Sequence, residues 1–529
     1  DGRDYSANVS YSADIGDSGR LSVDGFFVKT DRDVTEVSHE VEYDDGDVIE
    51  SRVPGLNPVD QQNWGIGAGY RFDMAGGSTR LDLDFARFQD GSAEREEKHE
   101  YLNGSWDASE AEAEAVDARD TEVGAKLAHV RPLGAAELEF GIDYRRKKRD
   151  VSYTRYAWEA AREGDTVDYA LDGVIGSLIE ETRLDPYAML SGHAGALSWE
   201  TGLRYETTRS DVRHHEDGDA GGQVRRDYNE LLPSLHLKWD VSEQTRINLS
   251  LARTVKRPNF NELIPALLDG EYGDNDYVGN PRLSPETANG IDLGFERRLG
   301  KHGVVGVNLF YRDVSDLIEL VNTGQWSEDA QDSYAKDLKK FLAKNPGASE
   351  KDFTFAPESW LFTSANVGDG TVRGVEFDLS TPLTALGLPN TGLFLNYSWL
   401  DSKVSDFRGE RRFNDQARSV YNIGFIHDIP SLAASFGATF RSQGDAYSRI
   451  LAEEVTVKYG DDLEMFVEKR FGRSLSVRLS AANLLDASKD EFFHKFDNLD
   501  DQLGRKYDEY ELETEQAGPS YQLVMRWAF

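Results

Sequence analysis

Two acidic stretches contain the residues of this sequence that are best suited to bind a metal ion. Asp269–Tyr277 (DGEYGDNDY) and Asp497–Glu515 are dense in carboxylate and amide oxygens, which are ligands that Ca²⁺ prefers. Their spacing matches no EF-hand loop, so solvated acidic loops are the favoured interpretation. The adjacent His214 and His215 have no clustered partner, and we interpret them as polar loop residues. The sequence therefore predicts no bound metal and no cofactor.

Catalytic and nucleotide-binding motifs are missing from the sequence. It contains no G-x-S-x-G, no H-E-x-x-H and no Walker loop. It also contains no cysteine, which excludes a thiolate nucleophile and a disulfide framework. A formal net charge of −37, from 96 acidic and 59 basic residues, repels nucleic acid. We therefore expect neither an enzyme nor a nucleic-acid-binding protein.

The elements that must position any functional residue alternate apolar and polar side chains with a period of two. Residues 197–206, 304–312 and 475–480 show the pattern clearly, which is typical of half-buried β-strands. The same template identifies about 19 strands along the chain. Only Asp329–Lys344 has a helical pattern. In the strands one face is apolar and the other polar, as shown by Leu197, Trp199 and Leu203 against Glu200 and Arg204.

The connections between these strands alternate in length. Tight turns such as Gly16–Gly19 and Arg131–Gly134 alternate with long connections such as 33–63 and 90–117. One rim of short turns and one rim of long loops is the plan of an outer-membrane barrel. No run of about 18 apolar residues is present that could form a membrane-spanning helix. We predict an all-β protein, a transmembrane antiparallel barrel with short periplasmic turns and long extracellular loops; a soluble barrel or propeller is the alternative.

The C-terminal segment PSYQLVMRWAF alternates strictly and ends on an aromatic residue. It resembles the terminal strand by which outer-membrane barrels are recognised for insertion. The alternative is a buried edge strand of a soluble protein. We predict that one face of this strand is a membrane-insertion signal for the barrel-assembly machinery, formed by Tyr521, Leu523, Met525, Trp527 and Phe529.

The second half of the chain resembles the TonB-dependent outer-membrane receptors. The matching residues lie between the strand-like segments Thr245–Ala252 and Thr287–Gly300. They are Arg253, Arg257, Pro258, Phe260, Leu263, Gly279, Asn280, Pro281, Leu283, Pro285 and Glu286. Asn366–Leu379 resembles the next strand of the family, and Leu479–Phe492 resembles the Asn-Leu segment near its end. The first half of the chain fits by its pattern of strands and loops. The resemblance gives none of these residues a catalytic role.

The resemblance implies a barrel of roughly 22 strands, preceded by a plug domain and an energy-coupling box. Neither is found in this sequence, so we expect 1–529 to be the barrel domain, with the plug and the first strands missing. Asp4–Gly16 would then be about the fourth strand; an intact barrel of about 19 strands is the alternative. The resemblance also implies a bacterial outer-membrane location, contact with outer-membrane lipid and lipopolysaccharide, and a TonB-type energy-coupling partner.

The function implied by the resemblance is energised uptake of a scarce small-molecule ligand. The family takes up iron–siderophore complexes most often, and cobalamin, haem and oligosaccharides are further ligands. A passive porin-like channel and a surface adhesin are the alternatives. The basic cluster Arg145–Arg149 (RRKKR) fits either an anionic ligand or the phosphates of lipopolysaccharide.

Ligand contacts are expected in the two long loops Pro258–Glu286 and Asn322–Glu358. Extracellular loops usually contact ligand, and aromatic side chains bury a large area on binding. The candidates are Tyr272, Tyr277 and Trp326. The alternative is that these side chains pack the loops against one another.

Overall fold

The computed structural model describes residues 2–44, 47–216, 219–265, 267–268, 275–357 and 359–528. The chain divides into two compact units. Unit 1 comprises Asp1–Leu190, Gly202–Leu232 and Asn259–Ala266. Unit 2 comprises Ser191–Thr201, Pro233–Pro258 and Leu267–Phe529. Each unit is described by itself below.

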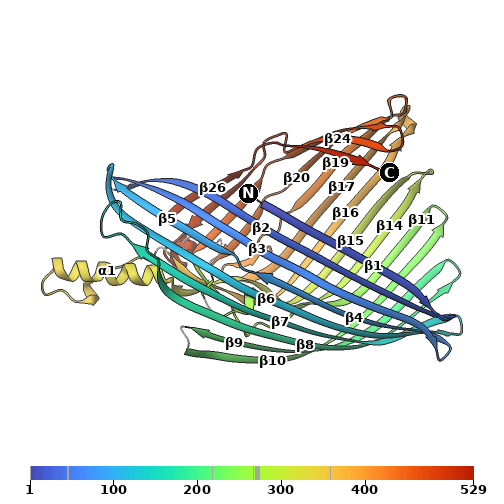
Figure 1. The fold of residues 1–529 in the computed structure, drawn as a ribbon, viewed down its shortest axis with the longest axis horizontal. Helices are drawn as coiled ribbons and strands as arrows, with labels where there is room; N and C mark the ends of the chain where they lie inside the picture. Colours follow the sequence, from blue (N-terminus) through green and yellow to red (C-terminus); the bar gives the residue numbers. More distant parts are fainter. Residues whose placement is uncertain are drawn as a thin grey trace. The chain divides into compact units, whose positions relative to one another are not determined.

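Unit 1 is built from long antiparallel strands that pair in chain order apart from one inserted hairpin strand, β5 (Figure 1). Short turns such as Ala75–Gly76 connect the strands at one end, and positive backbone angles there suit a tight reversal. The strands, some of which continue into unit 2, are β1 (Gly2–Ile15), β2 (Gly19–Asp44), β3 (Asp47–Met74), β4 (Gly77–Asp90), β5 (Ala93–Leu102), β6 (Ser105–Leu133), β7 (Ala136–Glu159), β8 (Ala170–Ala194), β9 (Leu197–Glu216) and β10 (Asp219–Ser242).

Two of the long connections expected from the sequence are largely strand. The β2–β3 register runs without interruption from Arg20↔Arg71 to Asp44↔Asp47, through most of the predicted loop 33–63. The predicted loop 90–117 contains β5 and the first part of β6, paired from Ala93↔Ala115 to Leu102↔Ser105. Both segments keep the alternation of the wall strands, and the ladder hydrogen bonds continue with it. The prediction of long connections stands, but these two are formed by extended hairpins rather than by loops without secondary structure.

Unit 2 is likewise a meander of antiparallel strands (Figure 1). Its strands in the main sheet are β11 (Thr245–Lys256), β12 (Leu267–Leu268), β13 (Asp276–Val278), β14 (Glu286–Leu299), β15 (Gly303–Trp326), β16 (Trp360–Leu383), β17 (Leu388–Asp406), β18 (Gly409–Arg411), β19 (Ser419–Ile429), β20 (Ala434–Gln443), β23 (Asp462–Phe471), β24 (Leu475–Ala482) and β27 (Ser520–Trp527).

The number of wall strands agrees with the sequence pattern. Among the described residues, 23 strands belong to the main sheet. Four of these, β5, β12, β13 and β18, are inserted in connections, and the other 19 follow one another along the chain. The prediction of about 19 wall strands is confirmed.

A second, four-stranded sheet is formed entirely by the connections after β20 and β24. It contains β21 (Ala446–Ile450), β22 (Glu453–Tyr459), β25 (Ser488–Lys495) and β26 (Glu509–Gln516). The sequence predicted a solvated acidic loop over part of this region. Instead Lys495 of β25 pairs with Glu509 and Glu511 of β26 at 3.2 and 3.0 Å. Cross-strand charge pairs of this kind let an acidic strand join a sheet.

The helices lie in connections. They are α1 (Glu328–Lys344), α2 (Leu499–Gly504) and the short 3-10 turns η1 (Asn261–Leu263), η2 (Glu350–Asp352), η3 (Thr384–Leu386) and η4 (Pro430–Leu432). The Ser327 side chain caps α1 by accepting a hydrogen bond from the Ala330 amide. The helix expected over Asp329–Lys344 is confirmed. No helix in the described ranges is long and apolar enough to cross a membrane.

The two faces of the main sheet have opposite chemistry in each unit. The apolar face exposes Ile142 and Leu203 in unit 1 and Leu309 and Leu479 in unit 2. The polar face carries ion pairs, such as Arg145 with Glu122 at 2.8 Å in unit 1. A transmembrane barrel wall shows its apolar face to lipid, so the apolar face is the lipid-facing one.

Candidate functional site

The connections of unit 2 are tied together by buried ion pairs. Arg411 of β18 donates to Glu319 of β15 at 2.6 Å and to Asp406 of β17 at 2.7 Å. Arg449 of β21 makes a two-point contact with the same Asp406, with both N–O distances 2.9 Å. The four side chains are between 6 and 12% exposed. We call Glu319, Asp406, Arg411 and Arg449 the loop network.

A second carboxylate extends this anchoring to the C-terminal connection. Glu454 of β22 accepts hydrogen bonds from Arg408 and from Arg505, which follows α2. Next to it lies the fully buried Gln502. Its side-chain oxygen accepts a hydrogen bond from the Ala452 amide at 3.0 Å, and its side-chain nitrogen donates one to the Ile450 carbonyl at 2.9 Å. Segments from three separate connections and the end of β15 are therefore held in one arrangement.

The electrostatics of the network favour charged carboxylates. Burial alone would raise the pKa of Asp406, but hydrogen bonds from Arg449 and other donors outweigh it and leave the pKa below its ordinary value of 3.8. Burial also opposes ionisation of Glu454, and the Arg505 guanidinium nevertheless lowers the pKa of that carboxyl. The arginines are saturated by these partners, so the loop network is an anchor for the loops rather than a free anion site.

Of the three residues predicted to contact ligand, Tyr277 and Trp326 are described, and they lie in different environments. Tyr277 is only 5% exposed and packs with Phe362 and Ile450, and its hydroxyl lies 2.9 Å from the Ser364 hydroxyl. Trp326 is half-buried at the base of the α1 connection. Tyr272 lies outside the described residues. The structure therefore shows Tyr277 packing the loops, while all three ligand roles stay predictions.

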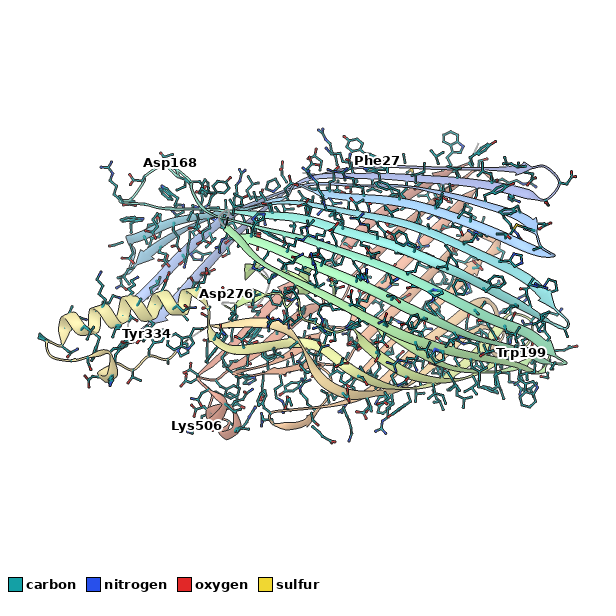
Figure 2. All side chains as sticks on the ribbon, turned by 90° about the horizontal axis from the view of Figure 1, so that it is seen from below. Phe27, Asp168, Trp199, Asp276, Tyr334 and Lys506 are labelled. Atoms are coloured by element: carbon teal, nitrogen blue, oxygen red, sulfur yellow. The ribbon has the colours of Figure 1, made fainter. Side chains whose placement is uncertain are left out.

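The α1 connection is held together by aromatic packing. The Trp326 ring lies 5.4 Å from Tyr334 and 5.3 Å from Phe355, measured between centroids. Figure 2 shows Tyr334 on α1, which extends away from the strand ends. Phe353 contacts both Tyr334 and Phe341, so the returning segment covers the aromatic side of the helix.

On the polar face of unit 1, the connection after β11 meets the wall. Arg149 of β7 makes a two-point contact with Asp120 of β6 at 2.7 and 2.6 Å. The same guanidinium bonds Asn261 and lies 5.7 Å from the Phe260 ring centroid. Ile264, three residues further along, is fully buried. This part of the predicted extracellular loop is folded against unit 1 rather than exposed to solvent.

The basic cluster RRKKR is divided by the strand period. Arg145, Lys147 and Arg149 lie on the polar face, paired with Glu122 and Asp120. Arg146 and Lys148 point the other way, where Arg146 contacts Glu180 of β8 at 2.6 Å and Lys148 contacts Asp150. The cluster therefore supplies cations to both faces of the wall.

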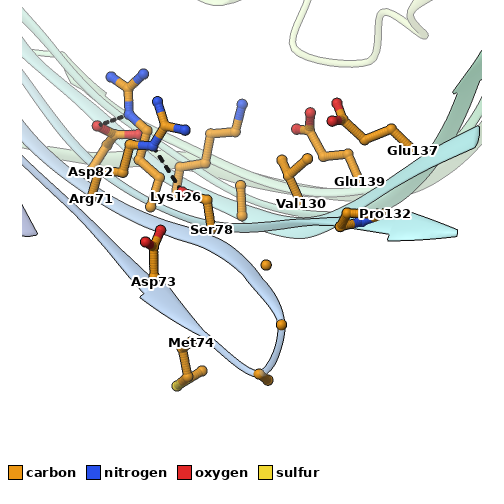
Figure 3. Close-up of a pocket in the computed structure, with 15 residues that line it drawn as sticks. Arg71, Asp73, Met74, Ser78, Asp82, Lys126, Val130, Pro132, Glu137 and Glu139 are labelled. Carbon is orange, nitrogen blue, oxygen red and sulfur yellow. Dashed lines mark hydrogen bonds and ion pairs between the residues drawn. The ribbon is translucent and has the colours of Figure 1, made fainter. Parts of the chain in front are cut away.

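Away from the long connections, the polar face of the main sheet has a hollow in each unit. In unit 1 a space of about 1040 Å³ is lined by residues near the short turns, including Arg71, Arg80, Asp82, Lys126 and Glu139, and Figure 3 shows the Arg80–Asp82 and Arg71–Ser78 contacts. In unit 2 a space of about 620 Å³ contains Phe466 with the Arg478 guanidinium 3.9 Å from its ring centroid. Both hollows are open, mixed-charge surfaces without a specific ligand cradle.

The C-terminal strand has the predicted arrangement on its described residues. β27 pairs with β24 in register from Ser520↔Ala482 to Trp527↔Leu475. Its four apolar residues of the proposed insertion signal are among the most exposed large side chains of the chain: Tyr521, Leu523, Met525 and Trp527. Phe529 lies outside the described residues. The role of the strand in insertion stays a prediction.

The described ranges contain no cluster of metal-binding side chains. No group of three or more His, Asp or Glu side chains there could hold a metal ion. His214 and His215 lie near different glycines: a Cβ added to Gly221 would meet His214, and one added to Gly176 would meet His215. Alternation along β9 sends the two rings to opposite faces, so they do not converge on one site.

Comparison with known proteins identifies the family. Residues 2–488 match the family model described as TonB dependent receptor-like, beta-barrel. No curated protein matches the chain. Among solved structures, the copper transporter OprC has a TM-score of 0.55 at 13% identity, covering 100% of this chain and 80% of OprC. The ferric yersiniabactin uptake receptor FyuA from Yersinia pestis has a TM-score of 0.54 at 11% identity, covering 100% of this chain and 79% of FyuA.

The ferric citrate transporter FecA, in its unliganded form, is similar as well, with a TM-score of 0.52 at 12% identity over 99% of this chain and 78% of that one. At such identities the structures show a shared fold, and the family model shows the membership. The protein is an outer-membrane β-barrel of the transport-receptor type, whose family implies a TonB partner and a bound ligand. The chain belongs to the TonB-dependent receptor family through its β-barrel.

Proposed function

We propose that this chain is the barrel of an energised receptor that takes up a scarce small ligand, with an iron–siderophore complex as the first candidate. The match of residues 2–488 to the receptor family carries the proposal. The structural neighbours are named for copper, ferric citrate and ferric yersiniabactin. At 11 to 13% identity they do not select a ligand, so cobalamin, haem and oligosaccharides are the competing classes.

The anchored loops support capture of a ligand rather than passive diffusion. A passive pore needs no fixed arrangement of its outer connections, whereas recognition needs side chains held in place before the ligand arrives. The loop network supplies such fixation with ion pairs that are at most 12% exposed. The half-buried Trp326, on the rigid α1 connection, is the preferred described contact for a ligand.

The first experiment removes the gene and measures growth on a panel of ferric chelates, haem and cobalamin as sole sources. We expect loss of growth on one source, restored by the intact gene, together with loss of saturable surface binding of that compound. Unchanged growth and binding on every source would contradict a receptor role and favour an adhesin. Growth loss without any saturable binding would favour a porin-like channel.

The ligand contacts are tested by separating packing from binding. Trp326→Ala and Tyr272→Ala should weaken binding of the identified ligand while leaving the heat stability of the barrel unchanged. Tyr277→Phe removes only the hydroxyl that contacts Ser364 and is the matched control, because Tyr277 is almost fully buried. Unchanged binding in the double variant would move the site to wall residues.

Membrane assembly is tested at the C-terminus. Removing Phe529, or replacing it with Ser, should lower the amount of folded protein in the outer membrane without changing ligand affinity per folded molecule. The matched control is Ala528→Ser, which alters the neighbouring residue. A normal outer-membrane yield after loss of Phe529 would disprove the insertion signal.

A further inference from the structure

Two exposed surfaces in the connections of unit 2 carry opposite charge. The first lies on α1. Residues 336–351 contain five lysines and only two acidic residues, in a chain whose formal net charge is −37. Three of the lysines, at every fourth position of the helix, are exposed and lie next to one another along it. We call Lys336, Lys340 and Lys344 the lysine row.

The lysine row lies on the side of α1 that the rest of the connection leaves uncovered. The returning segment packs against Tyr334 and Phe341 through Phe353, and the helical period places the lysines on the other side. Lys340 contacts Asp337 of the same helix at 3.3 Å, and both side chains are about half exposed. Lys336 and Lys344 form no ion pair with any residue that the structure describes. The row therefore presents positive charge outward.

The helix dipole explains only part of this charge. Cations are stabilised near a helix C-terminus, and the effect falls off within the last turn. It applies to Lys344, the last residue of α1, but not to Lys336, two turns earlier. The helix is also held firmly: the Glu328 amide donates to Asp276 at 2.7 Å, and the Tyr334 hydroxyl donates to Glu350 at 2.7 Å. The lysines thus stand on a fixed support that extends away from the strand ends (Figure 2).

The second surface is the acidic strand β26. It is the last strand of the four-stranded sheet and pairs, in the described part of the chain, with β25 alone. Every second residue of β26 points to the same face. On one face these residues are Glu509, Glu511, Glu513 and Glu515, which we call the glutamate row. Three of them, Glu509, Glu511 and Glu515, have side chains that are 49, 37 and 70% exposed.

The fold neutralises the glutamate row incompletely. Lys495 of β25 contacts Glu509 and Glu511, and Lys489 contacts Glu515 at 3.4 Å. Glu513 instead stands directly opposite Glu491 of β25, and like charges in that position destabilise a sheet. Burial, together with the neighbouring Glu511 and Glu491, raises the pKa of the Glu513 carboxyl. A cation that approached the row from outside would relieve this repulsion.

The two rows also match in spacing. Lysines four residues apart are separated by about 6 Å along a helix, and glutamates two residues apart by about 6.7 Å along a strand. Three lysines therefore meet three glutamates over a length of about 12 to 13 Å.

We propose that the lysine row of one molecule binds the glutamate row of a neighbouring copy of this chain. Both rows belong to connections on the long-loop side of the barrel, so they face the same compartment. Exposed ion pairs are individually weak, but two copies confined to one membrane have a high effective concentration. The contact joins two different patches, so it either pairs two copies reciprocally or links several in succession. The proposal is independent of the ligand that the receptor transports.

The test measures association of the full chain in lipid vesicles by energy transfer between dyes. The sequence has no cysteine, so Ala343→Cys, at an exposed position of α1, carries a single donor or acceptor. Two triple variants reverse the rows: Lys336→Glu/Lys340→Glu/Lys344→Glu and Glu511→Lys/Glu513→Lys/Glu515→Lys. The control, Lys238→Glu/Lys301→Glu/Arg473→Glu, reverses three exposed cations near the short turns.

We expect the parent and the control to show more energy transfer than randomly distributed molecules, and each reversed row to remove at least about half of the excess. A variant that combines both reversals should regain it, because each copy again carries complementary rows. The excess in the parent should fall between about 0.05 and 0.5 M salt. Transfer at the random value in the parent, or equal transfer in the parent and both reversed variants, would overturn the proposal.

A folding defect is separated from a lost contact by mixing two single variants. Lys340→Glu protein should associate poorly with itself but well with Glu513→Lys protein, since the exchanged charges then meet between copies. Equal transfer in the mixed and unmixed samples would contradict the proposal. Added poly-L-glutamate is a further probe: if it bound the lysine row of a parent that showed no excess transfer, the row would serve an acidic partner other than this chain, and the proposal would be wrong.

Discussion

Arginines and carboxylates form two networks at the extracellular ends of the strands, and they differ chiefly in burial. The loop network of unit 2 has side chains that are 6 to 12% exposed, and each of its four residues comes from a different strand. On the outer face of unit 1, exposed arginines pair with carboxylates of neighbouring strands, and we call these five residues the outer-face lattice: Arg146, Glu180, Asp211, Arg213 and Arg225. The arginines of this lattice are about half exposed or more. The same chemical pair therefore anchors loops where it is buried and presents a charged surface where it is open.

The physical reason for the difference is the cost of leaving a charge alone. Removing one member of a buried pair leaves an unpaired charge in a poorly solvated place, whereas water replaces the partner of an exposed charge. Effects of mutation should consequently be large in the loop network and small in the outer-face lattice. The four predictions below test this contrast, in order of expected effect.

The largest effect is expected for Arg411→Met. It leaves the Glu319 carboxylate without its cationic partner and Asp406 with Arg449 as its remaining arginine, and it should cost about 3 to 5 kcal/mol of local loop stability. Hydrogen exchange of residues 404–418 and 446–457 should rise sharply, while exchange in the wall strands stays slow. The control is Arg373→Met, which breaks the exposed Arg373–Asp401 pair and should change exchange little. Equal effects of the two variants would show that burial does not distinguish the networks.

A smaller effect is expected for the double variant Glu319→Gln/Arg411→Met. It removes the charge on both sides of the shortest pair in the loop network, so fewer ions are left without a partner than in Arg411→Met alone. Loop exchange should lie between that of the parent and that of the single variant. If the double variant were as unstable as the sum of its single variants, the coupling between Glu319 and Arg411 would be absent.

Much of the fold could be predicted from the sequence, because it depends on local alternation. The wall strands, the short turns, α1 and the exposed face of β27 follow from period and composition. A period of two also explains why the RRKKR side chains are divided between the two faces of the wall. Interpreting Arg145–Arg149 as one basic cluster did not predict this division. The loop network could not be predicted: Glu319 and Arg411 are separated by 92 positions, and nothing local marks one as the partner of the other.

The loop ligand candidates show the same limit. Aromatic residues in long polar connections predicted Tyr277 and Trp326 equally well, but pairing of β13 with β16 brings Tyr277 beside Phe362. Burial of that side chain comes from contacts between distant segments. Similarly, the acidic segment 509–516 became a strand because lysines of β25 lie opposite it.

Acid should loosen the loop network before it affects the wall. The pKa of Asp406 and that of Glu454 lie below their ordinary values of 3.8 and 4.5. A lowered folded-state pKa contributes stability above the ordinary value, and that contribution is lost as pH falls through the lowered one. The sequence has no cysteine, so Glu410→Cys carries a single spin label. Its mobility should be constant from pH 7 to about 5 and rise below about 4.

Asp415 provides a control for the acid experiment. Burial raises the pKa of this carboxyl, so it gains a proton at higher pH than Asp406 does. Replacing it in Asp415→Asn should leave the mobility change below about pH 4 in place. A transition that disappeared in Asp415→Asn would assign the acid response to Asp415 and remove it from the loop network.

The smallest effect is expected for Arg213→Gln in the outer-face lattice. Its ion pairs are exposed, so the free energy of unfolding should fall by less than about 1 kcal/mol. The difference should shrink further between about 0.1 and 1 M salt, because screening weakens exposed charges. Equilibrium unfolding in urea from lipid vesicles measures both values. A loss as large as that of Arg411→Met would show that the lattice is structural.

The most direct test of the receptor assignment follows the identified ligand into energised cells. Cells that express the protein are given the labelled compound with and without a protonophore, and surface binding and internal accumulation are measured separately. An energised receptor predicts that binding persists and accumulation stops when the proton gradient is removed. Equal accumulation in both conditions would contradict the account and indicate a passive channel, and binding without accumulation in energised cells would indicate an adhesin.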